Sequence, residues 1–396
     1  MNKLTLRTLS ALMLAAFSSV ASAAAFQLWE QNASGLGNAY AGSAAVADNA
    51  STVFFNPAGL TQLSGFQFSA GVTGVGPRYE FRDNGSSGAT MGSGNGGDAG
   101  GWHAVPNLYL SGRLTDNLFL GFGISTPFGL ATEYESGWIG RAQTIKSDIT
   151  TVNYNPSLAY RINDKVSLGF GANYQTIDAE LTNAGGVLKG DDRAWGWNAG
   201  VLFTLSPAMR VGVSYRSSMK YTLEGTLNGS APVKADVELP DTAILSVWQQ
   251  VSDRWEAMGD ISYTRWSTLK SLTVVSRTSG SVIAAAGETF NYDNSWRIAW
   301  GAAYKASEAA KVKFGIAYDR TPVNDTDRSA RVPDNSRLWL SLGGQWNAGP
   351  YGKVDVGYSY LYVKDSDINM NKNATLLRGS YDVSAHIVGV QYSVGF

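Results

Sequence analysis

Apolar residues occupy every second position over the last eleven residues of the chain, from His386 to Phe396. One face of this segment carries only apolar side chains: Val388, Val390, Tyr392, Val394 and Phe396. The alternate positions are small or polar, so the pattern predicts a β-strand of about ten residues with one apolar side. Membrane-spanning strands have this length and alternation. Strands of soluble antiparallel sandwiches alternate in the same way, so the remainder of the chain has to distinguish the two.

Alternating segments continue through most of the chain. From Phe66 onward we identify about fourteen of them, each bounded by turn residues, as expected for an antiparallel barrel. The expected strands are residues 66–75, 104–114, 117–126, 144–162, 166–182, 193–205, 209–224, 233–250, 254–275, 290–305, 310–320, 336–347, 352–364 and 381–396. An even number of strands returns both ends of the barrel to one side of the membrane.

The connections between these segments alternate between short and long. The short ones include Thr115-Asp116-Asn117, Asn163-Asp164-Lys165, Ser206-Pro207, Ser252-Asp253, Ser307-Glu308 and Ala348-Gly349-Pro350. The long ones lie near residues 76–103, 127–143, 183–192, 225–232, 276–289, 321–335 and 365–380. Short turns at one end and long loops at the other are typical of outer-membrane barrels, whose turns face the periplasm. The predicted fold is therefore an all-β membrane protein, a fourteen-stranded antiparallel outer-membrane β-barrel.

The first residues have the pattern of a secretory signal peptide. Lys3 and Arg7 form a basic stretch, an apolar run extends from Leu9 to Val20, and Ala21-Ser22-Ala23 is a small-residue cleavage site. A transmembrane helix would need about 20 apolar residues, which is longer than this run. We therefore expect residues 1–23 to be removed and the mature protein to begin at Ala24.

Residues 24–65 do not alternate and are rich in Ala, Gly, Ser and Asn. A segment of about forty such residues cannot form a core of its own, so it is either a plug inside the barrel or a flexible periplasmic tail. Its large apolar side chains would be costly to leave in water and favour the plug: Phe26, Leu28, Trp29, Phe54 and Phe55. We expect a small helical hatch at 24–65 and the barrel at 66–396.

Composition excludes several classes of function. The sequence contains no cysteine, so no disulfide or zinc-thiolate site is available. The 31 Lys and Arg residues balance 32 Asp and Glu residues, which gives no electrostatic reason to expect a nucleic-acid partner. The two histidines, His103 and His386, lie near expected strand ends and in no nucleophile motif. We therefore expect no enzyme activity, no metal site and no cofactor.

Several short motifs follow one another along the chain. In the expected hatch they are Phe26-Gln27-Leu28, residues 34–42, Asp48-Asn49-Ala50 and Asn56-Pro57-Ala58. In the barrel they are residues 129–133, residues 195–200, Tyr215-Arg216-Ser217, Arg297-Ile298-Ala299, and Val332-Pro333-Asp334 with Arg337, Trp339, Leu340 and Ser341. In these motifs, over essentially the whole mature chain, the sequence resembles the FadL family of outer-membrane long-chain fatty-acid transporters. The resemblance implies a fourteen-stranded barrel closed by a hatch.

The resemblance also implies a lateral gap in the wall where the third strand kinks, through which a lipophilic substrate leaves sideways into the membrane. The family's kink corresponds to Thr126, Pro127, Phe128 and Gly129. Proline lacks the ladder donor and glycine weakens a strand, so pairing should be interrupted here. The alternative is a strand that simply ends.

Asn56, Pro57 and Ala58 are the expected gating element of the hatch, placed near the kink. The residue before a proline is held extended, and the Asn56 amide could then bond backbone groups of the interrupted strand. The alternative is an ordinary turn in which Asn56 only caps Pro57.

Strand parity places three arginines in the lumen. Arg216, Arg297 and Arg337 point inward if their neighbours face lipid: Tyr215, Trp296, Trp300, Leu338 and Leu340. A fatty-acid carboxylate needs a cation, but lumenal arginines more often pair with acids of the wall and plug, such as Asp48. The apolar residues expected to touch the acyl chain are Phe54, Phe55, Leu60, Phe128 and Trp339.

The sequence departs from the family at one position. Where the fatty-acid members carry an arginine near the outer end of the fifth strand, this chain has Leu181-Thr182-Asn183. Relatives that import aromatic hydrocarbons or alkanes need no such cation. We expect passive transport of long-chain fatty acids, with hydrocarbon uptake in the same fold as the alternative. A general diffusion porin is a further alternative, but it would not need an apolar plug.

The expected partners follow from these assignments. They are a hydrophobic small-molecule substrate, outer-membrane lipid and lipopolysaccharide, and the barrel-assembly machinery, which would act on the C-terminal strand that ends at Phe396. We expect a monomer.

Overall fold

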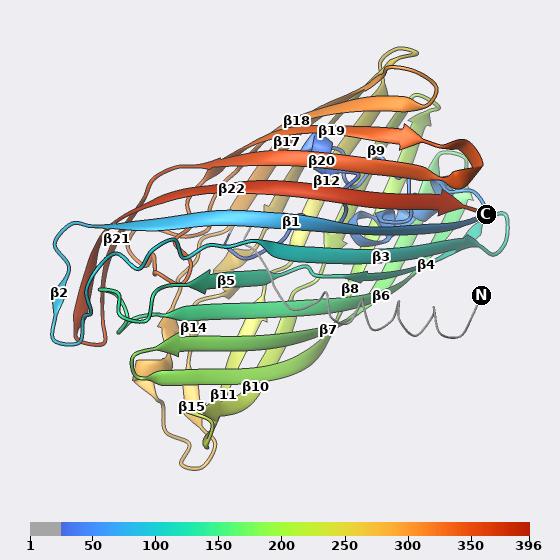
Figure 1. Ribbon diagram of the computed structural model, residues 1–396. Helices are drawn as coiled ribbons and strands as arrows, with labels where there is room; N and C mark the ends of the chain where they lie inside the picture. Colours follow the sequence, from blue (N-terminus) through green and yellow to red (C-terminus); the bar gives the residue numbers. More distant parts are fainter. Residues whose placement is uncertain (1–24) are drawn as a thin grey trace, which may run out of the picture.

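The protein is one antiparallel β-sheet that closes on itself, seen in a computed structural model that describes residues 25–396 (Figure 1). The first strand, β1 (Phe66–Asp83), pairs along its length with the last, β22 (Thr375–Gly395), and this pairing closes the barrel. The predicted signal peptide, residues 1–23, lies outside the described residues.

The wall consists of fourteen strands, three of which are interrupted and carry two labels. In order they are β1, β3 (His103–Arg113), β4 with β5 (Leu118–Ser125 and Gly129–Glu133), β6 (Lys146–Asn163), β7 (Val166–Asn183), β8 (Gly186–Ser206), β9 with β10 (Met209–Arg216 and Met219–Leu227), β11 with β12 (Ala231–Leu239 and Thr242–Gln250), β13 (Trp255–Thr264), β17 (Ser295–Lys305), β18 (Ala310–Asp319), β19 (Arg337–Asn347), β20 (Lys353–Val363) and β22. The predicted number and order of strands are confirmed.

The remaining elements are short. The small strands are β2 (Ser87–Gly88), β14 (Ser271–Leu272), β15 (Val274–Ser276), β16 (Glu288–Thr289) and β21 (Ser366–Lys372). The helices are η1 (Leu36–Asn38), α2 (Thr52–Phe55), η2 (Pro57–Gln62), η3 (Trp266–Thr268), η4 (Ala284–Ala286) and η5 (Gly349–Tyr351). Within residues 25–396, no helix is both long and apolar enough to cross a membrane.

Several strands are longer at the long-loop end than the sequence predicts. β1 continues to Asp83, β8 begins at Gly186, and β22 begins at Thr375. In the extensions of β1 and β22 the buried inner face is apolar, with Tyr79, Phe81 and Leu377, and the outer face is mainly polar. The apolar side of the alternation therefore changes from the outer to the inner face there, while the backbone ladder continues. The extension of β22 also corrects the position of His386. It lies well inside the strand rather than near its end, and its Nδ1 is 2.9 Å from the Tyr358 hydroxyl on the outer face.

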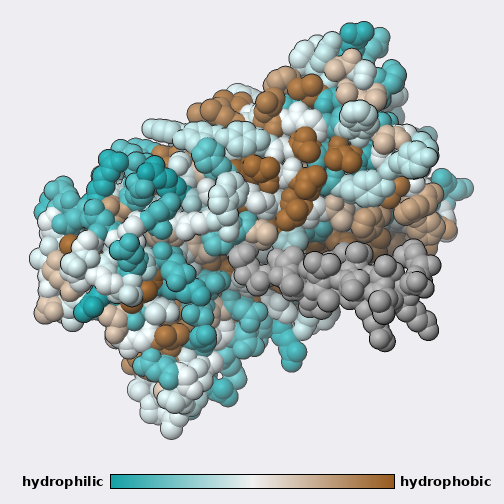
Figure 2. Space-filling model, in the orientation of Figure 1, coloured by the Kyte–Doolittle hydropathy of each residue, from teal (hydrophilic) through white to brown (hydrophobic). Residues whose placement is uncertain are grey.

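The wall alternates between a lipid-facing and a lumenal side, as expected. On β17, Trp300 is 68% exposed, whereas Arg297, at a position of opposite parity, is 1% exposed. Leu340 is likewise on the outer face and Trp339 is fully buried inside. Figure 2 shows apolar residues gathered over the middle of the wall and hydrophilic residues at the end that carries β2 and β21.

The amino-terminal segment, residues 25–65, is folded against the inside of the wall. Its Asn38 amide donates to the Ala302 carbonyl at 2.8 Å and to the Phe314 carbonyl at 3.1 Å. A Cβ atom at Gly315 would collide with the Asn38 backbone, and one at Gly200 would collide with the Asn56 side chain. Glycine at these wall positions is what lets the segment approach so closely.

Candidate functional site

The wall is interrupted between β4 and β5. β4 pairs with β3 as far as Leu108 and Ile124, but β5 pairs along its length with β6. Toward the long-loop end the strands are joined again, because the Glu133 amide donates to the Ala99 carbonyl at 3.0 Å. We call this stretch, between residues 103–107 of β3 and residues 125–131, the wall interruption. Pro127 lies within it, and a proline cannot donate to a ladder.

The amino-terminal segment bonds to the strand where β3 does not. The Leu28 amide donates to the Pro127 carbonyl, and the Gly129 amide donates to the Phe26 carbonyl, both at 2.8 Å. The Gln31 side-chain amide donates to the Thr126 carbonyl, also at 2.8 Å. Residues 26–31 therefore take the place of the missing strand partner from inside the barrel.

Aromatic contacts reinforce this arrangement. The Phe26 ring packs edge-on against Trp266 with centroids 4.9 Å apart, and Phe128 packs edge-on against the same Trp266 at 6.1 Å. All three side chains are buried. Edge-to-face packing of this kind adds to the stability from apolar burial.

Asn56, Pro57 and Ala58 lie elsewhere on the wall than expected. The Asn56 amide donates to the Ala44 carbonyl at 2.8 Å and to the Val201 carbonyl of β8 at 3.1 Å. Its Oδ1 accepts from the Ala58 amide at 3.0 Å, so Asn56 caps η2. The predicted bond from Asn56 to the interrupted strand is therefore wrong: Gln31 makes it, because α2 turns Asn56 toward β8.

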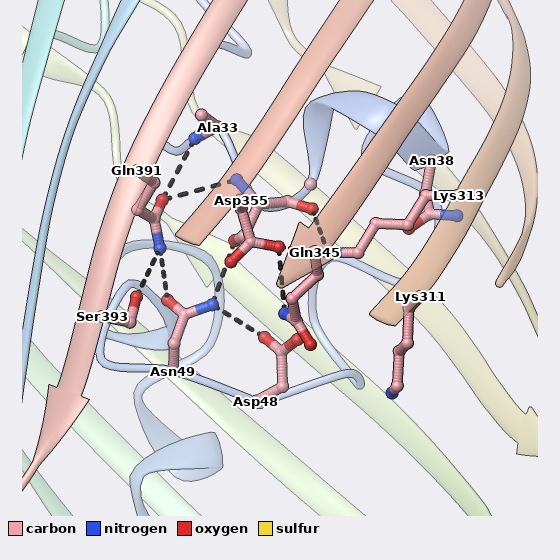
Figure 3. A network of polar contacts seen from close by, with 12 residues as sticks. Ala33, Asn38, Asp48, Asn49, Lys311, Lys313, Gln345, Asp355, Gln391 and Ser393 are labelled. Carbon is pink, nitrogen blue, oxygen red and sulfur yellow. Dashed lines mark hydrogen bonds and ion pairs between the residues drawn. The ribbon is translucent and has the colours of Figure 1, made fainter. Parts of the chain in front are cut away.

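A polar network fixes the segment to the wall near the short-turn end (Figure 3). Gln391 of β22 accepts from the Ala33 amide at 3.1 Å and donates to Asn49 at 3.2 Å. Lys313 of β18 donates to the Ser34 carbonyl at 2.8 Å and to Asp355 at 2.7 Å. These bonds join the segment to two wall strands, β22 and β18, and Asp355 of β20 holds Lys313 in place.

Asp48 belongs to this network and not to the predicted arginine pairs. Its Oδ1 accepts from the Asn49 side-chain amide at 2.8 Å. Burial acts to raise the pKa of Asp48, but nearby cations lower it below its ordinary value: Lys313, Lys353, Lys311 and Arg210. The carboxylate therefore stays ionised and helps to hold the segment in place.

The three predicted lumenal arginines differ in their partners. Arg297 Nη1 lies 3.8 Å from Asp260, and its guanidinium lies 4.6 Å from the Trp29 ring centroid. Arg337 Nη2 lies 2.5 Å from Asp334. Both arginines are buried beside a carboxylate, which is the pairing that a buried charge needs.

Arg216 has no such counter-ion. Among residues 25–396, no carboxylate lies within 4.0 Å of its guanidinium. It donates to the Phe54 carbonyl at 2.8 Å and to the Asn173 side chain, and it stacks over the Phe54 ring at 4.1 Å. Its side chain is only partly buried by protein atoms, so it faces the interior space with an unneutralised positive charge.

The predicted apolar residues fall into two groups. Phe55, Leu60 and Trp339 are buried in packing between the segment and the wall. Phe54 lies against Arg216, and Phe128 lies in a separate apolar cluster beside the wall interruption. Phe54 is therefore near a lumenal cation, and Phe128 is near the interrupted strand.

A pocket of about 370 Å³ opens among the long loops. Its walls are largely apolar and include Leu181, Leu188, Leu227 and Ile283. These residues belong to an apolar cluster that shares Val237 and Phe290 with the cluster containing Phe128. Packed apolar side chains thus continue from the loop end to the wall interruption.

Arg331 also lines this pocket, although no motif or strand pattern in the sequence predicts that it does. It comes from the loop before β19, its Nε lies 3.1 Å from Glu288, and it donates to the Gln143 and Lys146 carbonyls at 3.0 Å. Lys372 lies 2.5 Å from the same Glu288, so the cluster keeps one net positive charge. A cation therefore stands beside Leu181, although the local sequence carries none.

Glu30 is a buried acid in the segment with no hydrogen-bond partner for either carboxylate oxygen among the described residues. Burial raises the pKa of Glu30 to about 7, and Arg337 and Arg297 offset only part of this effect. Within residues 25–396 no group of His, Cys, Asp and Glu side chains could hold a metal ion.

A family model of outer membrane protein transport proteins (OMPP1/FadL/TodX) matches residues 14–396. The chain belongs to this family. It is 34% identical to Outer membrane protein P1 of Haemophilus influenzae over 86% of each chain. It is 31% identical to a Long-chain fatty acid transport protein of Escherichia coli over the full length of both. The family assignment predicted from the motifs and the outer-membrane location are thereby confirmed.

Solved structures of the family share the fold. A Pseudomonas aeruginosa FadL homologue superposes with a TM-score of 0.88 at 22% identity, covering 94% of this chain and 100% of the other. The Pseudomonas putida toluene transporter TodX superposes with a TM-score of 0.65 at 17% identity, covering 88% of this chain and 94% of the other. The family transports hydrophobic substrates across the outer membrane.

Proposed function

We propose that the protein is a passive outer-membrane transporter of long-chain fatty acids. In this proposal the substrate enters the pocket among the long loops on the extracellular side. It follows these packed apolar side chains, brings its carboxylate to Arg216, and leaves sideways through the wall interruption. Residues 24–65 act as a hatch that closes this exit. No catalytic step, metal or cofactor takes part.

The observation that carries the proposal is the solitary charge of Arg216. Of the three lumenal arginines predicted to bind substrate, Arg297 and Arg337 already have carboxylate partners, whereas Arg216 has none among the described residues. An interior cation without a counter-ion is costly unless an anion joins it. A fatty-acid carboxylate supplies that anion and can pair with the guanidinium in a bidentate manner.

The entrance also suits an anion with a long apolar chain. The pocket is mainly apolar, and Arg331 and Lys372 share the single carboxylate of Glu288. Each methylene group moved from water to apolar surface contributes about 0.8 kcal/mol, so a long acyl chain is captured strongly. The net positive charge supports first recognition of the carboxylate in the absence of an arginine at 181–183.

At the exit, residues 26–31 would be the moving part of the hatch. They hold the interrupted strand through three hydrogen bonds, which a small displacement would break. Asn56, Pro57 and Ala58 would be the fixed point about which this displacement occurs, because Asn56 bonds to β8. In this proposal the three residues contribute to gating because they anchor the hatch to β8.

Uptake in a bacterial host without its own fatty-acid transporter tests the proposal. Cells that express this chain should take up radiolabelled oleate, and Arg216→Met should lower oleate uptake by about tenfold, as expected for the loss of one charge-assisted pair. Arg254→Met is the matched control, since Arg254 is exposed in the short turn before β13. Wild-type cells that fail to take up oleate would refute the proposed function.

Hydrocarbon uptake is the second candidate. The mainly apolar wall of the pocket favours it, because Leu181, Leu188 and Ile283 can hold a hydrocarbon that has no head group. Toluene and hexadecane uptake, measured in the same cells, distinguishes the two candidates. Uptake of either hydrocarbon without oleate would assign the protein to the hydrocarbon branch. A diffusion porin is disfavoured by the segment folded inside the barrel.

We also propose that the protein works as a monomer within outer-membrane lipid and lipopolysaccharide. Its C-terminal strand would be the signal for the barrel-assembly machinery. Phe396 at its end is 79% exposed, and its amide donates to the Phe66 carbonyl at 2.8 Å. The exposed terminal ring is accessible to such a partner.

A further inference from the structure

Asn107 of β3 marks the point at which the wall opens. The last pair between β3 and β4 joins Leu108 to Ile124, so the next position inward along the interruption would join Asn107 to Ser125. Ser125 in turn pairs with Asn153 of β6. Residues 107, 125 and 153 therefore lie at one level across three strands, with their side chains on the lumenal face.

The side chain of Asn107 is buried without a hydrogen-bond partner. It is 4% exposed, and neither its Nδ2 donor nor its Oδ1 acceptor is bonded within the described chain. Ser125 Oγ and Asn153 Oδ1, at the same level of the wall, are in the same condition, and so is Oε1 of the hatch residue Gln31. Buried polar atoms are almost always paired in native proteins, so unpaired ones gathered at an opening indicate a ligand.

No charged side chain stands opposite Asn107 on β1, and the cation Arg216 lies within electrostatic range of Tyr109, two residues further along β3. Gly71 of β1 faces it across the ladder, and a Cβ at Gly71 would lie 3.3 Å from Asn107 Oδ1 and 3.2 Å from Gln391 of β22. Its titratable neighbour on β3 is Tyr109, whose hydroxyl donates to the Gln31 carbonyl at 2.8 Å. Glu30 of the hatch directly precedes Gln31, and the charged wall residues that act on it are Arg337, Arg297 and Asp319.

We propose that Asn107 is the exit site of the transporter and binds the substrate head group as a neutral carboxylic acid. A primary amide presents one donor and one acceptor side by side. A protonated carboxyl group presents the complementary acceptor and donor, so the two can form a pair of hydrogen bonds. A carboxylate is acceptor-only and cannot satisfy Asn107 Oδ1. The inference rests on the proposed function and names the form in which the fatty acid leaves.

The chemistry of the exit requires this form. An ionised carboxylate is very costly in hydrocarbon, so a fatty acid must be neutral when its head group enters the membrane. Low-dielectric surroundings already favour the protonated acid. The proton comes from solvent, according to RCOO⁻ + H₃O⁺ → RCOOH + H₂O, and no oxidant or reductant takes part. Arg216 thus receives the anion and Asn107 receives the acid.

The test is oleate uptake by full-length variants in the outer membrane of a host without its own transporter. Asn107→Leu removes the donor and the acceptor at nearly constant volume, and we expect uptake to fall about tenfold, as for two lost hydrogen bonds. Ser111→Ala is the matched control, because Ser111 is also a buried, unbonded polar residue on the lumenal face of β3, but lies where β3 and β4 are paired. Its uptake should equal that of the wild type at equal surface abundance.

A second variant separates binding from packing. Asn107→Asp is nearly isosteric, and as a carboxylate it lacks the donor, whereas as a carboxylic acid it regains one donor and one acceptor. We expect low uptake relative to wild type at pH 8 and recovery at pH 5.5, since a buried aspartate is protonated well above its ordinary pKa of about 3.9. This variant also carries the test if Asn107→Leu does not reach the membrane.

The outcomes are distinct. Wild-type uptake of oleate, loss in Asn107→Leu and recovery of Asn107→Asp at low pH would establish the exit site. Uptake by Asn107→Leu equal to wild type, or an Asn107→Asp to wild-type ratio that is the same at both pH values, would overturn it. Absence of oleate uptake in the wild type would instead refute the proposed function and the exit site with it.

Discussion

The side-chain amide of Gln31 donates to the backbone carbonyl of Thr126 over 2.8 Å, so the amino-terminal segment supplies a hydrogen bond that no neighbouring strand supplies. The same amide donates to the Leu28 carbonyl at 2.9 Å, which fixes its orientation. Gln31 is fully buried. One side chain thus connects the amino-terminal segment to the point at which the barrel wall is interrupted.

Gln31→Leu should loosen the closed exit. The bond to the Thr126 carbonyl, worth about 1 kcal/mol, is lost and that carbonyl is left unpaired, which favours the open form by up to about tenfold. We expect faster oleate uptake at equal surface abundance. Gln249→Leu, at an exposed position on β12, is the control. Uptake at or below the wild-type rate would contradict closure by Gln31.

Gly129→Arg should block the exit. Gly129 is buried, and its amide bonds to Phe26, so a long charged side chain there fills the wall interruption. Oleate uptake should fall to the background of cells without the protein. Gly137→Arg is a suitable control, because a Cβ at Gly137 meets nothing within 4 Å. Undiminished uptake by Gly129→Arg would exclude a lateral exit at this position.

Asn56→Ala should release the anchor of the hatch. It removes the bonds to the Ala44 and Val201 carbonyls and the cap on η2, and cap losses alone cost about 1 kcal/mol. We expect altered oleate uptake together with a lower unfolding temperature of the purified protein. The hatch model fails if uptake is unaltered at equal surface abundance.

Glu30 should make the stability of the hatch depend on pH. Its pKa is raised from 4.5 to about 7, so the folded form holds a proton that the unfolded form has released between these values. Stability from this group is therefore greatest below about pH 4.5 and declines as pH rises to 7, by about 3 kcal/mol.

Thermal unfolding of the purified protein between pH 5 and pH 8 tests this expectation. Glu30→Gln keeps the protonated shape and should flatten the decline, which raises the unfolding temperature at pH 8. Glu308→Gln is the control, because that side chain is 93% exposed. An identical pH profile for Glu30→Gln and wild type would show that Glu30 does not titrate in this range.

Features that depend on local pattern were predictable from the sequence. Parity along a strand determines which face a residue occupies, so the inward direction of Arg297 and the outward direction of Trp300 follow from alternation alone. The interruption at Pro127 follows from a missing backbone donor. The expectation of a hatch came from the apolar side chains of residues 24–65 and from the family motifs, because alternation cannot reveal it.

Features that depend on packing between distant segments were not predictable. Arg331 reaches the pocket beside Leu181 because a long loop folds over the barrel end, and no local pattern encodes that path. The partner of Asn56 depends on how α2 sits against β8 rather than on the Asn-Pro-Ala motif. The unbonded amide of Asn107 is visible only once its neighbours are known.

The glycines at 200 and 315 have a consequence for how the molecule could be assembled or exchanged. Each is the place where a backbone or side chain of the segment occupies the space of a missing Cβ. The segment has too few residues for a core of its own, so it can acquire its shape only inside a wall that is already curved around it. A segment transplanted from another barrel would therefore need glycines at the matching positions of the new wall.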